Sequence, residues 1–171
     1  MADASVFRRR YSCRRFAHTK LFRGQLEHIL EAAVWAPSAG NLQPWRFIVV
    51  TSDALKAQLA AAAHQDFVAE APVVIVVCAV PGESARRYGE RGRSLYCLQD
   101  TAAATQSILL AATELGLGSC WVGAFEERAA AAALGLPPVV RPVALIPVGQ
   151  PLETPATRER RPEGEVVIFR G

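Results

Sequence analysis

The chain has 171 residues, of which 51% are hydrophobic and 20% charged, and its formal net charge at pH 7 is +3. This composition excludes a disordered chain and indicates one compact domain over residues 1–171. No apolar run approaches the ~20 residues that a membrane span needs, and the arginine-rich start does not resemble a secretory signal, so we expect a cytoplasmic protein with no membrane partner.

The predicted elements begin with two helices. Residues 5–11 are expected to form a short helix, and the apolar spacing of residues 24–36 indicates a second helix that ends at Pro37. Residues 37–44 (PSAGNLQP) consist of small polar residues and helix breakers, which predicts a loop. A strand with β-branched residues follows over 45–51.

The middle of the chain contains the longest predicted elements. An alanine-rich helix is expected over 53–64 with Ser52 as its N-cap, and the continuous apolar run 72–80 is typical of a strand covered on both faces. Residues 81–93, rich in glycine and charge, are predicted to form a surface loop. The helical pattern over 94–115 is apolar on more than one face, which favours burial from several sides.

The last third alternates short elements and ends in an arm. We expect a strand over 119–122, a helix over 126–134, a strand over 142–148 and an extended C-terminal arm over 152–171 that ends in the strand-like EVVIF (165–169). Helices and strands interleave without regular βαβ units. The pattern therefore predicts an α+β fold with a central mixed β-sheet surrounded by helices, and it is compatible with exchange of the C-terminal strand in a homodimer.

The residues that usually carry catalysis or bind metals form no pattern. Three histidines show no zinc spacing, and the four cysteines, which we expect to be reduced, stand far apart at Cys13, Cys78, Cys97 and Cys120. There is no dinucleotide-binding glycine loop after a strand, no GxSxG and no evident carboxylate pair. We therefore expect no metal and no catalytic side chain, and a borrowed cofactor that carries the chemistry.

Arginines are concentrated in three segments of the chain, at residues 8–23, 86–93 and 158–161. Taken alone, these clusters leave three interpretations open: a solvated surface, a nucleic-acid patch or a pocket for a small phosphate. Nucleic acid is disfavoured, because aromatic residues do not alternate with the cations and no recognised binding motif is present.

Four segments, in order along the chain, resemble the signatures of the FMN-dependent nitroreductase family: RRYSCRRF (9–16), APSAGNLQPWRFIVV (36–50), LGLGSCWVGAF (115–125) and LGLPPVVRPVALIPVGQP (134–151). The match covers nearly the whole chain. RYGERG (87–92), followed by a helix with Gln99 and Asp100, is similar to the short, single-domain members of that family.

The resemblance implies how the phosphate of FMN is bound. The family motif carries over to Arg10, Ser12 and Arg14, with Tyr11 contributing mainly its backbone. Side chains two apart in an extended turn point the same way, and guanidinium groups suit a phosphate dianion, so these residues can converge on one ligand. A second basic pair of the family, before a proline, matches Arg158 and Arg160, which would meet the same phosphate.

Further flavin contacts are implied on two other segments. In the loop 37–44, the residues that would contact an FMN molecule bound mainly by the other subunit are Pro37, Ser38, Asn41 and Gln43. The second would place backbone groups beside the reactive edge of the flavin, at Cys120, Trp121, Val122 and Gly123. Trp45 is expected to be a core aromatic, and Cys120 a buried, small hydrophobic residue rather than a redox group.

The resemblance implies a homodimer with FMN at its interface and NAD(P)H as electron donor. The implied reaction is ping-pong: hydride passes through flavin N5, and a small-molecule acceptor, nitroaromatic or quinone, is then reduced by two electrons. One alternative is a specialised flavin enzyme on the same scaffold, a reductive dehalogenase or dehydrogenase, which the short region after Val80 disfavours because it leaves little room for a substrate lid. The other is a non-catalytic basic protein that binds nucleic acid or an anionic partner.

Overall fold

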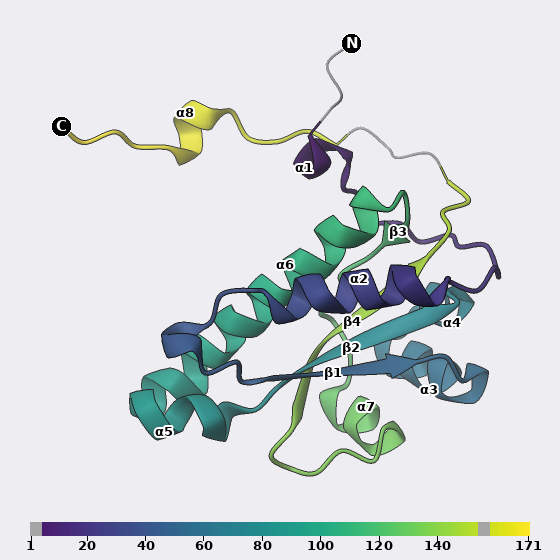
Figure 1. Ribbon diagram of the computed structural model, residues 1–171, viewed down its shortest axis with the longest axis horizontal. Helices are drawn as coiled ribbons and strands as arrows, with labels where there is room; N and C mark the ends of the chain where they lie inside the picture. Colours follow the sequence, from purple (N-terminus) through teal and green to yellow (C-terminus); the bar gives the residue numbers. More distant parts are fainter. Residues whose placement is uncertain (1–4, 154–157) are drawn as a thin grey trace.

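The computed structural model describes residues 5–153 and 158–171, and a four-stranded sheet lies at its centre (Figure 1). The strand order is β1-β2-β4-β3, and the strands are β1 (Trp45–Val50), β2 (Val73–Ala79), β3 (Gly118–Ser119) and β4 (Arg141–Gly149). The predicted α+β class is confirmed. The three ladders are antiparallel, however, where the sequence predicted a mixed sheet; the parallel pairing that occurs is a single bridge between Ser12 and Ser119.

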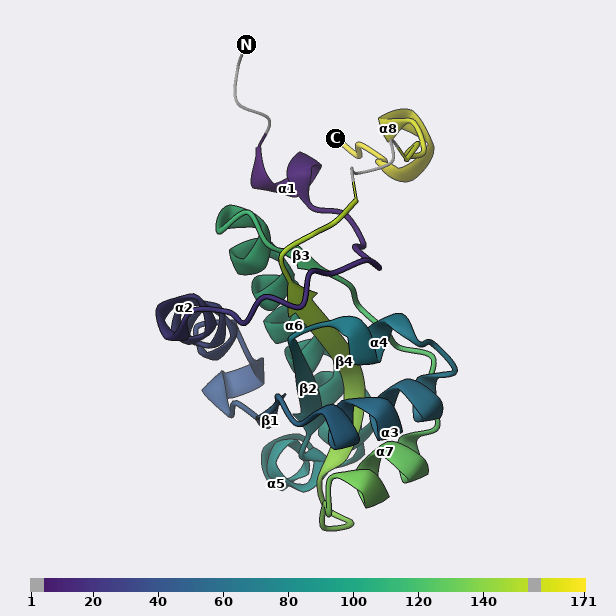
Figure 2. The ribbon, with the colours of Figure 1, turned by 90° about the vertical axis from the view of Figure 1, so that its right-hand side faces the viewer.

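Strand β2 divides the core into two layers. Every residue of β2 is buried, as its continuous apolar sequence predicts. Alternate side chains enter different hydrophobic clusters: Val73, Ile75 and Val77 face α2 and α6, whereas the even-numbered residues between them face α3, α4 and α7. Figure 2 shows these two groups of helices on opposite sides of the sheet.

The helices agree with the predicted pattern within a few residues, apart from the segment after β2, the short helix α4, which was not predicted, and α8, which lies in the predicted extended arm. They are α1 (Val6–Arg9), α2 (Arg23–Val34), the 3-10 turn η1 (Ala39–Asn41), α3 (Asp53–Ala63), α4 (Phe67–Glu70), α5 (Pro81–Arg91), the π turn η2 (Gly92–Tyr96), α6 (Cys97–Glu114), α7 (Glu127–Ala133) and α8 (Glu163–Val166). Ser52 stands at the N-cap of α3 as expected, although its side chain forms no capping hydrogen bond.

Residues 81–93 form a helix rather than the predicted surface loop. Pro81 occupies the first turn of α5, where its missing N–H is tolerated, and the helical path breaks only at Gly89, which has a φ of 56°. The chain then runs through η2 directly into α6, and Gly92 packs against the backbone of Ser84. Packing of α5 on η2 therefore outweighs the local preference of its glycines for a turn.

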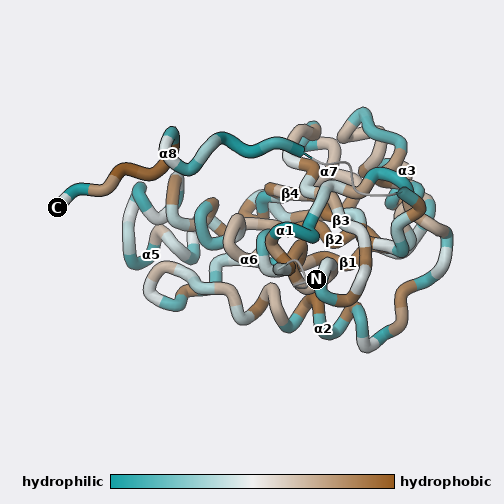
Figure 3. Tube along the Cα trace, turned by 90° about the horizontal axis from the view of Figure 1, so that it is seen from above, coloured by the Kyte–Doolittle hydropathy of each residue, from teal (hydrophilic) through white to brown (hydrophobic). Residues whose placement is uncertain are grey.

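The C-terminal arm leaves the body of the molecule. Residues 154–157 of this predicted arm lie outside the described residues. Glu163–Val166 forms the short helix α8 where the sequence predicted a strand, and Ile168 and Phe169 beyond it are exposed. Figure 3 shows this apolar end projecting from the body; with no neighbouring strand to pair with, the segment cannot form a ladder in one chain.

Neither a helix that could span a membrane nor a metal-binding group of side chains occurs within the described residues. None of the helices within residues 5–153 and 158–171 is long and apolar enough to cross a membrane. In the same residues, no three histidine, cysteine or acidic side chains come together as a metal-binding group would. All four cysteines are buried free thiols.

Candidate functional site

Backbone pairing joins the arginine–serine motif to the segment that follows α6. Ser12 and Ser119 form a parallel bridge, and the N–H of Cys13 donates to the carbonyl oxygen of Ser119 over 2.9 Å. Gly118 permits this approach, because a Cβ there would lie 2.6 Å from Sγ of Cys13. The segments 9–16 and 115–125 therefore lie side by side.

The side chains of this motif alternate between core and surface. Cys13 is fully buried in a small cluster with Phe16 and Ala71, whereas Ser12 is half-buried and Arg14 is exposed. Since neighbouring side chains in extended backbone point to opposite sides, Arg10, Ser12 and Arg14 share the side that faces away from Cys13.

The Cys120 thiol lies among these three polar side chains. Burial raises the pKa of Cys120 and the nearby Glu153 carboxylate raises it further, whereas the charge of Arg14, a hydrogen bond with Ser12 and the charge of Arg10 lower it. Cys120 is 2% exposed, in agreement with its predicted role as a small buried residue. Arg10, Ser12 and Arg14 therefore all lie near one buried thiol, and their joint binding of a phosphate stays a prediction.

The Glu153 carboxylate also lies near the Cys120 thiol, but it pairs with neither the Arg10 nor the Arg14 guanidinium among the described residues. The backbone N–H of Arg14 donates to Oε1 of Glu153 over 2.7 Å, while its guanidinium lies 5.8 Å from the ring centre of Phe67. Among residues 5–153 and 158–171, no carboxylate forms an ion pair with Arg10 or Arg14. Both positive charges remain available to an anionic ligand.

Tyr11 contributes a side-chain contact as well as backbone. Its hydroxyl donates to the backbone oxygen of Glu153 over 3.2 Å, which ties the motif to the start of the C-terminal arm. Burial raises the pKa of Tyr11 to about 12. The phenol therefore stays neutral over the physiological pH range.

The segment after β3 is fixed to β4 through its main chain. Val122 exchanges two hydrogen bonds of 3.0 Å with Leu145, and the N–H of Cys120 donates to Pro147 over 3.3 Å. Val122 is buried, while Trp121 is 41% exposed and Gly123 is also exposed. Trp121 and Gly123 can thus face a ligand while the residue between them anchors the segment.

The loop 37–43 has an unusual backbone. Gly40, Asn41 and Gln43 all have positive φ values between 50° and 57°, a region that residues other than glycine rarely adopt. The N–H of Gln43 donates to Oγ of Ser38 over 3.0 Å, and Nε2 of Gln43 donates to Oδ1 of Asn41 over 3.3 Å. Asn41, Gln43 and Pro37 are exposed. The polar side chains of the loop are therefore presented at the surface.

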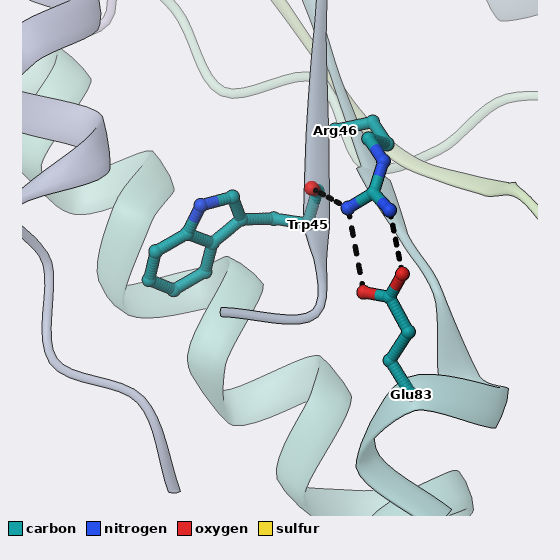
Figure 4. Close-up of polar contacts among 3 residues, drawn as sticks. All are labelled: Trp45, Arg46 and Glu83. Atoms are coloured by element: carbon teal, nitrogen blue, oxygen red, sulfur yellow. Dashed lines mark hydrogen bonds and ion pairs between the residues drawn. The ribbon is translucent and has the colours of Figure 1, made fainter. Parts of the chain in front are cut away.

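Helix α5 supports this loop and the strand that follows it. A Cβ on Gly40 would lie 2.6 Å from the hydroxyl oxygen of Tyr88 and 2.8 Å from a guanidinium nitrogen of Arg87, so α5 closes directly over the loop. Figure 4 shows Glu83 of α5 paired with Arg46, which also donates to the backbone oxygen of Trp45 over 2.7 Å. The Trp45 ring points away from this pair into the core, as predicted.

Asp100 on α6 holds the loop from the interior. Its Oδ1 accepts a hydrogen bond of 2.9 Å from the N–H of Ala39, and the residue is 5% exposed. Burial raises the pKa of Asp100. Tyr88 and Asp100 belong to segments that resemble family motifs, and nothing in their local pattern reveals a contact with a loop 48 to 61 residues earlier in the chain.

One chain does not bring the two sets of candidate residues together. The loop lies at the N-terminal end of α6, where Asp100 contacts Ala39, and the arginine–serine motif lies beyond its C-terminal end, next to β3 (Figure 1). An α-helix of 18 residues is about 27 Å long, so these two sets are separated by roughly the length of α6.

Arg158 and Arg160 are not joined to the first set either. Both are exposed, and the guanidinium of Arg160 donates to the backbone oxygens of Arg158 and Glu159. Within the described residues no hydrogen bond links this pair to Arg10 or Arg14. The predicted meeting of both arginine clusters is therefore not formed in the single chain.

An apolar groove runs along α6 on the side of α1 and α2. Its volume is about 370 Å³, and it is lined mainly by Val6, Ala32, Trp35, Leu110 and Ala111. Trp35 is 81% exposed, and Val34 and Phe7 nearby in the sequence are also exposed. Large apolar side chains that remain exposed near a groove are typical of a surface that another chain covers.

Comparison with known proteins places this arrangement among related molecules. The model of the Nitroreductase family matches residues 7–67 and 60–150. A protein of Archaeoglobus fulgidus, whose name provisionally assigns it as an NADH dehydrogenase/NAD(P)H nitroreductase, is 40% identical over 147 residues that cover 83% of this chain and 81% of its own. An NADH dehydrogenase of Thermus thermophilus is 34% identical, with 99% and 96% of the two chains covered. The crystal structure of a nitroreductase family protein from Clostridium novyi superposes with a TM-score of 0.79 at 38% identity, covering 88% of this chain and 86% of that one.

Proposed function

The chain belongs to the nitroreductase family, and from this premise we propose that it is an FMN-dependent oxidoreductase that uses NAD(P)H to reduce a nitroaromatic or quinone-type acceptor. Relatives with the names NADH dehydrogenase and NADPH nitroreductase support an oxidoreductase with a nicotinamide donor. The observation that carries the proposal is the backbone pairing of the arginine–serine motif with the segment after α6, through the bridge between Ser12 and Ser119 and the hydrogen bond from Cys13 to Ser119. This pairing brings the motif beside Cys120.

The residues beside Cys120 fit a phosphate monoester. Two guanidinium groups, which form no ion pair within the described residues, and one hydroxyl group offer forked, charged donors together with a neutral donor. The Oγ of Ser119 beside them is buried and has no hydrogen-bond partner among the described residues, so it is a further polar group that a ligand can satisfy. Arg10, Ser12 and Arg14 would hold the FMN phosphate, and the backbone around Trp121 and Gly123 would lie along the ring.

Bound FMN would supply two-electron hydride chemistry between the nicotinamide donor and the acceptor. The chain itself would bind and orient: the arginines hold the phosphate and favour an anionic ligand, and the amides of Asn41 and Gln43 can each donate to and accept from polar atoms of the ring or its side chain. No side chain of this site needs to act as a general base. The specialised reductive dehalogenase or dehydrogenase would use the same binding residues.

A complete site needs two chains, because the loop and the arginine–serine motif lie at opposite ends of α6. We propose a homodimer in which a two-fold axis brings the loop of one chain to the motif of the other. The dimer then contains two identical sites at its interface. The apolar groove along α6 and the exposed Trp35 supply the surface that such pairing would cover.

The C-terminal arm fits the same arrangement. Its exposed Val166, Val167, Ile168 and Phe169 have no place to pack in one chain. Exchange onto the partner would pair this segment with a sheet and could carry Arg158 and Arg160 to a phosphate. Deletion of residues 165–171 should then raise the dissociation constant of the dimer in sedimentation experiments; an unchanged value at low protein concentration would contradict exchange.

The proposal is tested with the purified full chain. We expect a yellow protein with flavin absorbance bands, tight rebinding of FMN after its removal, and oxidation of NADH or NADPH that depends on an added nitroaromatic or quinone. A colourless protein that FMN does not bind, but that retards DNA in a salt-sensitive manner, would contradict the proposal and favour a basic nucleic-acid binder instead.

A further inference from the structure

The Asp100 carboxyl group is buried beneath the loop 37–43 and is only partly paired. One of its oxygens accepts the hydrogen bond from Ala39, whereas Oδ2 is buried without a partner among the described residues. Burial of a carboxyl group that is incompletely hydrogen-bonded costs free energy. Ala103 and Ala104, which follow on the same helix, pack in an apolar cluster with Trp45.

A capping role on α6 does not account for this residue. Asp100 is in the first turn of α6, where an acidic side chain usually stabilises free N–H groups. Here the chain enters α6 directly from η2, and the N–H of Cys97 already donates to Gly92 and Leu95. The polar contact that distinguishes Asp100 is therefore the one with Ala39.

The backbone of the loop needs such external support. Asn41 and Gln43 have positive φ values, and each non-glycine residue in that region costs free energy that the surroundings must offset. The hydrogen bond from Ala39 to Asp100 fixes one end of η1, and Arg87 and Tyr88 close over Gly40. The loop is thus held between α6 on one side and α5 on the other.

We infer that Asp100 is a positioning residue for the flavin-contacting loop: by accepting the Ala39 N–H it holds Ser38, Asn41 and Gln43 in the conformation in which they meet FMN. This inference rests on the proposed function, because it takes the loop to be a cofactor contact. A loop that is ordered before the ligand arrives loses less conformational entropy on binding, so removal of the anchor weakens binding even where the fold persists.

The experiment compares FMN dissociation constants, measured by fluorescence titration of the full chain after removal of its flavin. Asp100→Leu removes the acceptor, and we expect its dissociation constant to rise about tenfold or more. Asp100→Asn keeps an oxygen that can accept from Ala39, so it should rescue binding to within about threefold of the wild type. At saturating FMN, Asp100→Leu should recover most of the wild-type kcat, because the residue does not touch the reacting atoms.

A second variant removes the same bond from the loop side. Ala39→Pro deletes the N–H donor at the first position of η1, and the extended Ser38 before it (φ −141°, ψ 152°) suits a following proline. Because the ring directs its Cδ at the Asp100 oxygen that lies 2.9 Å from the nitrogen, the substitution also pushes the loop away from its anchor. It should weaken FMN binding as Asp100→Leu does, and because it alters no buried helix it carries the test if Asp100→Leu does not fold.

Thr101→Val is the matched control for general damage to α6. Thr101 is buried next to Asp100, but its hydroxyl bonds only to backbone oxygens of its own helix. We expect a lower melting temperature with an unchanged FMN dissociation constant. Wild-type affinity in both Asp100→Leu and Ala39→Pro, or an equal loss in Thr101→Val, would overturn the inference. A wild-type chain that binds no FMN would instead overturn the proposed function.

Discussion

The two halves of the candidate site are built in different ways. The arginine–serine motif is held by its backbone: Ser12 pairs with Ser119, Ala17 donates to Gln150 over 2.9 Å, and Leu152 donates to Arg15 over 3.0 Å. The loop 37–43 is held by side chains of other elements, through Asp100 and through the closure of Tyr88 over Gly40.

This difference predicts which substitutions change the affinity for FMN and which change the stability of the fold. Where the backbone forms the support, as around Arg10 and Arg14, the ligand-facing side chains can be replaced with little effect on the fold. Where side chains form the support, as around the loop, substitutions change the conformation of the site itself.

The largest effect is expected when both guanidinium groups are removed from the first half. Arg10→Ala combined with Arg14→Ala should raise the FMN dissociation constant about 100-fold or more, because charge-assisted hydrogen bonds to the phosphate are lost. The melting temperature without FMN should remain close to that of the wild type. Arg91→Ala, which removes an arginine on α5 that stacks on Tyr96, is the control and should leave FMN affinity unchanged. Equal losses in both variants would contradict the phosphate assignment.

Gly118→Ala tests the backbone contact that supports the first half. The new Cβ would collide with Sγ and Cβ of Cys13, which are 2.6 and 2.7 Å away, and both atoms are buried. We expect a loss of about 1–3 kcal/mol in the free energy of unfolding, measured by urea denaturation. Gly24→Ala on α2, where nothing lies within 4 Å of the new Cβ, should stabilise slightly. Similar stability in the two variants would show that the approach of β3 to Cys13 is not tight.

Arg158→Ala tests whether the C-terminal arm completes the first half. Arg158 is exposed in the single chain, so its replacement should not alter the free energy of unfolding. If the arm carries it to the phosphate in the dimer, the FMN dissociation constant should rise about tenfold. An effect no larger than that of Arg91→Ala would exclude Arg158 from the phosphate site.

Tyr11→Phe gives the smallest effect and depends on pH. Loss of the hydrogen bond to Glu153 should lower the free energy of unfolding by about 1 kcal/mol at pH 7. Burial raises the pKa of Tyr11 from 10.0 to about 12, so the folded state favours the neutral phenol. That contribution is complete below pH 10 and is lost as the pH rises towards 12. The alkaline decline in stability, measured by urea denaturation, should therefore be steeper in the wild type than in Tyr11→Phe; parallel curves would contradict a buried phenol.

The sequence predicted the parts of the molecule that depend on local pattern. The continuous apolar run of β2 and the helical spacing in α2 and α6 follow directly from which side chains must be buried. The alternation of side chains in an extended turn likewise predicted that Arg10, Ser12 and Arg14 share one side. Helix α5 was not predictable from its glycines, because packing against η2 determines it.

The contacts that hold the loop 37–43 were also not predictable from the local sequence pattern. The contact of Asp100 with Ala39 joins residues 61 apart in sequence, and a single acidic residue in a helix gives no indication of such a partner. The C-terminal strand illustrates the opposite error: EVVIF has strand-like composition, but a strand requires a neighbour that one chain does not provide.

The most direct test of a site shared by two chains is complementation between two defective variants. One variant carries Arg10→Ala and Arg14→Ala, and the other carries Asn41→Ala and Gln43→Ala. Each should bind FMN poorly by itself, because each homodimer has the same defect in both sites. After the subunits are mixed and allowed to exchange, random pairing should restore about a quarter of the wild-type sites, since each heterodimer contains one intact site. Flavin binding and NAD(P)H oxidation above the mean of the two variants would be the result that we predict. No gain in a mixture that demonstrably forms heterodimers, or a monomer that binds one FMN tightly, would contradict the account.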